Sequence, residues 1–291
     1  MVSRIPNDIF QFSTVSALMA GLCTSGPLAH QLTGYGTHGL GTCSALNGEV
    51  LFLDSVAYHI TTSPSKKSSS QSMTQGAADD QEALNDAARG LDPVIKKAAR
   101  DAMMPFVQVT LFRPEFRLPL PLPQSKTLSK SSLLNTLSSP PRSPGGPLPP
   151  ADLKGTTGGQ NSFLPFLIRG TFADMTIRIG GPIKDDSESL AQVTARAPQW
   201  RIKGAKGTIF GFLSPAWSNG ISVAGFHGHF IEDEGQGARR GGHVLDFVVG
   251  EGEGRVEWGV SGHHHLGLPR GEEWESLELG VDAEGIAKAE G

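Results

Sequence analysis

The chain has 291 residues, of which 38% are hydrophobic and 19% charged, so it can bury a sizeable core and is not expected to be disordered. Its 37 glycines and 20 prolines follow no collagen-like period and indicate many turns, low-complexity insertions, or both. The net charge of −4 argues against a nucleic-acid partner, the two cysteines cannot form a disulfide framework, and the lack of a long apolar run or an apolar N-terminal segment predicts a cytoplasmic protein without a membrane span.

The N-terminal part of the chain predicts short elements separated by turns. The apolar stripe of Ile9–Gly21 predicts a helix that Ser13 or Thr14 can cap. A glycine-rich turn is expected at Gly34–Gly41, and the β-branched and aromatic residues of Glu49–Ile60 indicate one or two strands.

The composition then becomes polar and rich in serine, alanine and proline. Ser63–Gln75 is typical of a surface loop, and Asp79–Gly90 and Asp92–Met104 are predicted to form two short helices. Phe106–Phe112 is predicted to be a strand. Leu118 to Ser162 has the composition of a mobile loop, because so little apolar surface cannot offset the entropy of ordering the chain.

From Phe163 onward the pattern becomes that of a sandwich or barrel of antiparallel strands. Turn residues punctuate the segment at short intervals, and short connections favour antiparallel pairing. No dinucleotide-binding glycine motif, phosphate-binding loop or GxSxG elbow occurs. The expected strands are Phe166–Arg169, Met175–Ile179, Gln199–Ile202, Gly207–Phe212, Ser222–Ile231, His243–Gly250 and Arg255–Val260.

Three histidines in this segment are candidate metal ligands. His227 and His229 are two residues apart, so on a strand both imidazoles project from the same face. His243 begins the next predicted strand, and an antiparallel hairpin can bring it opposite the pair. Three converging imidazoles suit Zn²⁺, or less specifically another first-row divalent metal, and leave coordination positions open.

A single HxH pair on a strand is often incidental, so the third histidine is the feature that raises the metal hypothesis. A competing run, His263–His265, lies at a predicted turn. Successive strand residues alternate between faces, so these three side chains cannot all converge, and we expect them to face solvent.

The motifs of the chain, taken in order, resemble the α-acetolactate decarboxylase family. The resemblance covers essentially the whole chain apart from two insertions, at about residues 66–104 and 119–160, and the loop between His229 and His243 is longer than in the family. It rests on IFQFSTVSALMAG, GLGTCSALNGEVLFLD, FLIRGTF, GTIFGFLSP, NGISVAGFHGHF and GGHVLDF.

The resemblance implies a zinc-dependent carboxy-lyase that converts 2-acetolactate to (R)-acetoin and CO₂, with no organic cofactor. It implies that the zinc ligands are the three histidines and that Thr42 and Glu49 belong to the active site. It also implies a homodimer acting on a small-molecule substrate.

Two further site residues follow from the position of family motifs. The active-site arginine aligns with Arg178, with Arg169 as an alternative. The glutamate of the C-terminal tail that reaches back to the metal corresponds to Glu290, with Glu284 as the fallback.

The chemistry of a β-keto acid accounts for these residue types. Loss of CO₂ moves an electron pair toward the ketone, and a metal that chelates the adjacent hydroxyl and ketone oxygens stabilises the developing charge. Arg178 is suited to position the carboxylate, and a glutamate must protonate the enediolate on one face. We favour Glu49 as the proton donor, with Thr42 orienting it or the substrate, and Glu290 as a ligand or a partner in proton handling.

We therefore expect an α/β, β-rich fold in a single unit: an N-terminal mixed sheet with a few helices over about 1–180 and an antiparallel, barrel-like sheet carrying the metal site over about 181–291. Two alternatives remain open. One is another HxH…H metalloenzyme, such as a hydrase or a cupin-type oxygenase. The other is a non-catalytic β-rich binding module.

Overall fold

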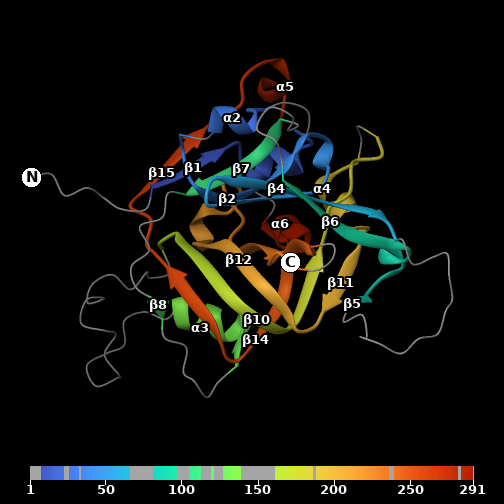
Figure 1. Ribbon diagram of the computed structural model, residues 1–291. Helices are drawn as coiled ribbons and strands as arrows, with labels where there is room; N and C mark the ends of the chain where they lie inside the picture. The colour runs from blue at the N-terminus through green and yellow to red at the C-terminus, as the bar shows by residue number, and fades with distance from the viewer. Residues whose placement is uncertain are drawn as a thin grey trace, which may run out of the picture.

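The computed structural model of the chain describes residues 8–22, 26–32, 34–65, 81–97, 105–112, 119–120, 127–138, 161–185, 188–235, 239–280 and 283–290. Two sheets dominate it, with the N-terminal sheet above the C-terminal barrel in Figure 1. No helix among these residues is long and apolar enough to cross a membrane.

The first sheet is mixed and has the strand order β15-β1-β7-β2-β3-β4-β6. Its β1 and β15 pair in parallel, whereas the other neighbours are antiparallel. The strands are β1 (Asp8–Phe12), β2 (His38–Cys43), β3 (Glu49–Leu53), β4 (Val56–Pro64), β6 (Leu91–Lys97), β7 (Phe106–Phe112) and β15 (His263–Gly267).

The second sheet closes on itself. Its order is β5-β11-β10-β12-β13-β14-β8, β9 pairs with β14, and β14 also returns to pair with β10, so that four strands form a barrel. The strands are β5 (Gln81–Ala83), β8 (Pro119–Leu120), β9 (Leu128–Ser129), β10 (Leu164–Arg178), β11 (Gln199–Ile202), β12 (Ala205–Ser214), β13 (Gly225–Glu232) and β14 (Gly241–Trp258).

Short helices cover the edges and the seam between the sheets. In Figure 1 α6 lies between the mixed sheet and the barrel, close to the C-terminus. The helices are α1 (Val15–Met19), α2 (Ala29–Leu32), α3 (Lys130–Ser138), α4 (Leu190–Ala195), α5 (Glu272–Glu275) and α6 (Ala283–Glu290), with 3₁₀ turns η1 (Ser44–Leu46), η3 (Asp86–Ala88) and η5 (Ala216–Ser218).

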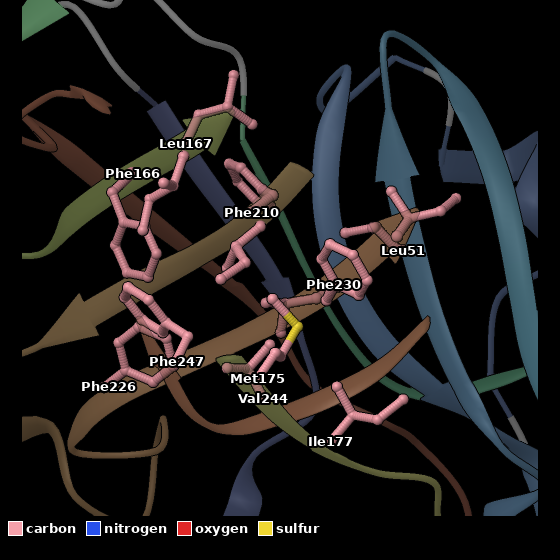
Figure 2. Packing of buried hydrophobic residues seen from close by; sticks show 14 of the residues in the cluster. Leu51, Phe166, Leu167, Met175, Ile177, Phe210, Phe226, Phe230, Val244 and Phe247 are labelled. Carbon is pink, nitrogen blue, oxygen red and sulfur yellow. The ribbon is translucent and has the colours of Figure 1, made fainter. Parts of the chain in front are cut away.

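Aromatic rings fill the barrel. The Phe172 ring lies 5.4 Å from that of Phe230 and 6.1 Å from that of Phe247, and Phe166 stacks on Phe226 at 5.2 Å. Figure 2 shows Phe166, Phe226 and Phe247 gathered at one end of this cluster. Side chains alternate along a strand, so the residues of β13 that alternate with Phe226 and Phe230 face out of the barrel. On that outer side β13 contacts β3 of the mixed sheet.

This architecture confirms the predicted β-rich fold with a mixed sheet and an antiparallel barrel. The expected boundary near residue 180 does not separate the two sheets, because β10 belongs to the barrel and β15 to the mixed sheet. Several predicted elements are also confirmed. The strands at Glu49–Ile60 form β3 and β4, Phe106–Phe112 forms β7, and Thr14 caps α1 by accepting from the Ala17 N–H.

The N-terminal helix prediction is only partly right. Ile9–Phe12 belongs to β1, because its alternating burial fits a strand that pairs with both β7 and β15. The predicted turn at Gly34–Gly41 likewise ends early, since β2 begins at His38. At Gly39 a Cβ would lie 2.5 Å from the Thr110 carbonyl oxygen, so this glycine permits a close strand pairing rather than a turn.

The two helices predicted between residues 79 and 104 are wrong where the structure describes them. This stretch forms β5, η3 and β6, and residues 98–104 lie outside the described part. Ile95 pairs with Ile60 and packs on the core, and Pro93 is tolerated because β6 is an edge strand that needs fewer N–H donors.

The low-complexity segment is not wholly a loop. Within Leu118 to Ser162 the structure describes β8, β9 and α3, where Leu128 and Leu133 are buried in the core; residues 121–126 and 139–160 lie outside the described part. Most of the polar loop at Ser63–Gln75 also lies outside it.

Four of the predicted strands merge into two longer ones. β10 covers most of the strands predicted at Phe166–Arg169 and Met175–Ile179, and β14 covers most of those predicted at His243–Gly250 and Arg255–Val260. Their pairing shifts register near Gly170 and Asp174, where bulges accommodate the extra residues. The turn expected at His263–His265 is wrong, because these residues form β15 beside β1.

Candidate active site

Three histidines meet on the barrel wall that faces the mixed sheet. His229 of β13 lies directly opposite His243 of β14, and His227 precedes His229 by two residues on the same face. The ring centroids are 5.2 to 5.4 Å apart, and one ligand nitrogen from each ring lies within 4.8 Å of the others. The structure therefore brings together the three side chains whose spacing predicted convergence.

Burial lowers the pKa of two of these rings. The pKa of His227 is lowered well below its usual value by desolvation, reinforced by His229 and the Arg178 guanidinium. The pKa of His229 is also lowered by desolvation, against the opposing effect of Glu49. Neutral imidazoles expose a nitrogen lone pair, which is the form that binds a metal.

The donor set fits a divalent first-row metal. His229 Nδ1 lies 3.0 Å from the Val50 carbonyl oxygen, so it carries the proton and donates, and Nε2 is left with its lone pair. That Nε2 is buried and has no hydrogen-bond partner among the described residues. Three imidazole nitrogens with one orphaned acceptor match the ligands that Zn²⁺ prefers in sites that keep open positions.

Arg178 lies beside the histidines because the strand register places it there. It is paired with His243 across β10 and β14, so both side chains share one face. Its side chain is 5% exposed, and its Nε has no hydrogen-bond partner in the described part of the chain. A buried guanidinium that lines a cavity in this state is suited to bind an anionic ligand.

Two carboxylates close to Arg178 in the sequence pair with other arginines. Asp174 accepts from Arg201 Nε at 2.8 Å, and Glu188 accepts from Arg196 Nη2 at 2.7 Å. Each carboxylate has its pKa lowered by its own arginine, in Glu188 to about 2. The positive charge of Arg178 is therefore not cancelled by either of them.

The alternative arginine, Arg169, lies away from this cavity. Its side chain is 46% exposed and its Nη1 donates to Glu257 Oε2 at 2.9 Å. It is not among the residues that line the cavity with the histidines.

Thr42 and Glu49 approach the histidines from the mixed sheet. They are direct partners in the β2–β3 register, and both line the cavity. Glu49 Oε1 accepts from the Gly180 N–H at 3.1 Å, and its Oε2 lies 3.5 Å from His229 Nε2. Since the Glu49 side chain is only 14% exposed, it is not simply a solvated turn residue.

The turn that holds Glu49 depends on the preceding glycine. Gly48 has a φ of +78°, and a Cβ there would lie 2.3 Å from the Ile60 carbonyl oxygen. Its own carbonyl accepts a hydrogen bond from Thr42 Oγ1 at 3.0 Å. The asparagine–glycine–glutamate stretch thus positions both candidate side chains at once.

An apolar wall completes the cavity. It comes from α1, η1, α4 and the segment before β13, and faces the polar end formed by the histidines, Arg178 and Glu49. The apolar lining residues are Val15, Leu18, Leu46, Leu190, Val193 and Val223. One charged end and one aliphatic wall suit a small anion that carries alkyl groups.

The C-terminal tail returns to this wall. α6 contacts α1 and α4, and its Ile286 is buried against Val15 and Val223. Glu290 is the last residue of α6, but its side chain lies outside the described part of the structure. Glu284, the fallback, is exposed.

Gln108 is a lining residue that the sequence interpretation missed. It lies opposite Thr42 in the β2–β7 register, is 5% exposed, and lines the cavity beside the histidines. Its Nε2 donates to Thr110 Oγ1 at 3.1 Å. The available signal was two polar residues, Gln108 and Thr110, on the same face of an otherwise apolar strand.

A protein-family model and several known proteins match most of the chain. The model described as "Alpha-acetolactate decarboxylase" matches residues 9–81 and 150–281, and the intervening residues 82–149 overlap both expected insertions. An α-acetolactate decarboxylase of Lactococcus lactis subsp. cremoris is 28% identical over 245 residues, covering 84% of this chain and 81% of that protein. One from Bacillus subtilis is 24% identical over 243 residues, covering 84% and 75%.

Solved structures share the fold. The crystal structure of α-acetolactate decarboxylase from Bacillus subtilis strain 168 superposes with a TM-score of 0.73 at 20% identity, covering 98% of this chain and 99% of that one. A Staphylococcus aureus protein described as of unknown function and similar to α-acetolactate decarboxylase gives a TM-score of 0.71 at 24% identity, covering 97% and 100%.

Proposed function

The chain belongs to the α-acetolactate decarboxylase family, and from this premise we propose that it converts 2-acetolactate to (R)-acetoin and CO₂ with a zinc ion held by His227, His229 and His243. As a member of that family it is a carboxy-lyase with a small-molecule substrate. The observation that carries the finer proposal is the convergence of these three histidines beside a buried arginine whose Nε has no hydrogen-bond partner among the described residues.

The ligand type supports zinc as the metal, because three imidazole nitrogens are donors that Zn²⁺ prefers. The three imidazoles would hold the ion, with His229 oriented by the Val50 carbonyl. When bound, the ion supplies Lewis acidity that stabilises negative charge developing on the substrate's oxygens.

Arg178 binds the substrate carboxylate. Its guanidinium is buried at the polar end of the cavity, and a planar fork suits the two oxygens of a carboxylate. The bond from the carboxylate carbon to the neighbouring carbon then breaks, CO₂ leaves, and the electron pair passes into the adjacent ketone to give an enediolate. Binding the carboxylate too tightly would oppose this step, so Arg178 mainly positions the group.

Glu49 delivers the proton that completes the reaction. Gly180 holds Oε1, and Oε2 lies 3.5 Å from His229 Nε2, at the end of the cavity where the substrate would react. Donation from this fixed side of the cavity protonates one face of the enediolate and gives one enantiomer. Glu49 then regains a proton from solvent, which balances the one consumed.

The other lining residues orient the substrate. Thr42 keeps the turn before Glu49 in place through its bond to Gly48, and Gln108 offers an amide to the substrate's oxygens. The aliphatic wall receives the two methyl groups and excludes water from the developing carbanion. We propose Glu290 as a ligand or a proton-handling partner from the tail.

Family membership favours this reading over a hydrase, an oxygenase or a non-catalytic module. The homodimer and the cytoplasmic location stay predictions from the sequence.

The test is acetoin release from racemic 2-acetolactate by purified protein, before and after removal of metal with a chelator and re-addition of zinc. We expect acetoin well above the spontaneous rate, loss with the chelator and recovery with zinc. No acetoin from protein whose zinc content is confirmed would refute the proposal.

Two variants sharpen the assignment of roles. Glu49→Gln keeps the shape and the Gly180 hydrogen bond but removes the acid, so the rate should fall by about 10²- to 10⁴-fold and the residual acetoin should lose enantiomeric excess. His229→Ala should lose metal and activity while the protein stays folded. A Glu49→Gln enzyme that still makes one enantiomer at the normal rate would exclude Glu49 as the donor.

A further inference from the structure

A second cluster of metal-ligand side chains lies at one edge of the mixed sheet, on β1 and the edge strand β15. Asp8, His263 and His265 each offer one ligand atom, and these atoms lie within 4.8 Å of one another. None of the three lines the cavity of the candidate active site. We propose that they form a surface site for a divalent transition-metal ion.

The strand register explains why these side chains converge. His263 and His265 are two residues apart on β15, so they project from the same face. Asp8 is the direct partner of His263 in the parallel β1–β15 pairing, which places its carboxylate beside them. The two histidine ring centroids are 5.8 Å apart. Figure 1 shows β15 alongside β1.

The middle histidine of the run is excluded by the same alternation. His264 pairs with Ile9 on the other face, and its ring packs edge-on against Phe163 at 4.6 Å. The HHH motif therefore supplies two ligands rather than three, and the third comes from a strand 255 residues away in the sequence.

A hydrogen bond already orients two of the three side chains. His263 Nδ1 lies 3.1 Å from Asp8 Oδ1, so without metal an N–H···O bond already orients both groups. Both side chains are about half exposed, and His265 is exposed as well. Binding therefore needs little desolvation, and water can occupy the remaining coordination positions.

The donor types select the class of ion. Two imidazoles and one carboxylate suit Zn²⁺, Ni²⁺ and Cu²⁺, whereas Mg²⁺ and Ca²⁺ prefer sets made only of oxygen. A bound ion would join β15 to β1 through side chains as well as through backbone bonds. Since α5 and α6 follow β15 in the chain, such an ion would fasten the point from which the tail departs toward the cavity.

The test compares metal content in the full-length protein. Wild type, the double variant His263→Asn/His265→Asn and Asp8→Asn are dialysed to equilibrium against micromolar Zn²⁺, and zinc per chain is measured by elemental analysis. His30→Asn, which removes another exposed histidine, is the matched control. We expect the double variant to bind one ion fewer per chain than wild type and Asp8→Asn to bind that ion more weakly.

This difference is read independently of the cavity site. His229→Ala should lose a cavity ion yet keep the surface ion, so failure of the proposed function would leave the comparison intact. As a second measurement, amide exchange across residues 263–267 should slow with Zn²⁺ in wild type but not in the double variant. Equal zinc content in wild type and the double variant, equal loss in His30→Asn, or an unchanged affinity in Asp8→Asn would overturn the proposal.

Discussion

Replacing Arg178 by methionine tests two effects of this side chain separately: its contribution to substrate binding and its effect on the free energy of unfolding. Arg178 is 5% exposed, and its Nε has no hydrogen-bond partner among the described residues. Methionine keeps an unbranched chain in the same space and removes the charge and the unpaired donor.

The burial of Arg178 and its unpaired Nε give the expected changes in kcat/KM and in the free energy of unfolding. A hydrogen bond to a charged group is worth about 1.5–3 kcal/mol, and each 1.36 kcal/mol is a factor of ten, so kcat/KM for 2-acetolactate should fall about 10- to 150-fold. An unsatisfied buried donor costs about 1–3 kcal/mol, so the free energy of unfolding of the metal-free protein should rise by up to about that amount.

The assays are acetoin formation at several substrate concentrations and urea unfolding followed by tryptophan fluorescence. Arg169→Met is the control: that side chain is 46% exposed and pairs with Glu257 on the surface, so it should change stability by less than about 1 kcal/mol and leave kcat/KM unaltered. An unchanged kcat/KM in Arg178→Met would refute carboxylate binding. A large loss of stability would show that the fold itself requires the charge.

Three further predictions concern the scaffold around the cavity. Gly48→Ala forces a side chain onto a φ of +78° and against the Ile60 carbonyl, so the melting temperature should drop, with a cost of at least about 1–2 kcal/mol, and activity should fall; a thermal melt that matches wild type would contradict this. The pKa of Glu188 is lowered to about 2 by Arg196, so the stability from this pair is present above the ordinary carboxyl value of 4.5 and is lost as the pH falls toward about 2. Unfolding midpoints of wild type should therefore decline more steeply over that range than those of Glu188→Gln, and parallel curves would refute the linkage. Burial raises the pKa of the Cys43 thiol to about 12, so Cys43 in the native protein should resist iodoacetamide at neutral pH. Mass spectrometry of the Cys43 peptide checks this, and rapid alkylation at that residue would contradict it.

The sequence by itself determined the hairpin that carries the three histidines, because the two-residue period of a strand can be recognised in a linear pattern. The spacing of His227 and His229, and a polar loop before His243, were enough to predict an antiparallel hairpin with three converging imidazoles. Strand alternation and hairpin pairing involve neighbouring residues, so a linear pattern records them. The stretch around Glu49 was found by resemblance to the family, because a glutamate after a glycine has no local signature of function.

Pairing between distant segments decided the rest. Ile9–Phe12 became a strand because β7 and β15 supply partners on both sides, and Leu91–Lys97 did so because β4 accepts it at the sheet edge. A short apolar run carries no record of such partners, so its period alone does not separate a strand from a helix.

The charge state of the cavity also belongs to the tertiary structure. Arg178 had Asp174 and Glu188 as nearby carboxylates in the sequence, and only the fold shows that other arginines hold both. The pairing of Asp8 with His263 across 255 residues is of the same kind. The sequence thus determined which side chains an individual hairpin presents, whereas only the tertiary structure decided which charges and ligands meet, because those distances depend on the register of strands far apart along the chain.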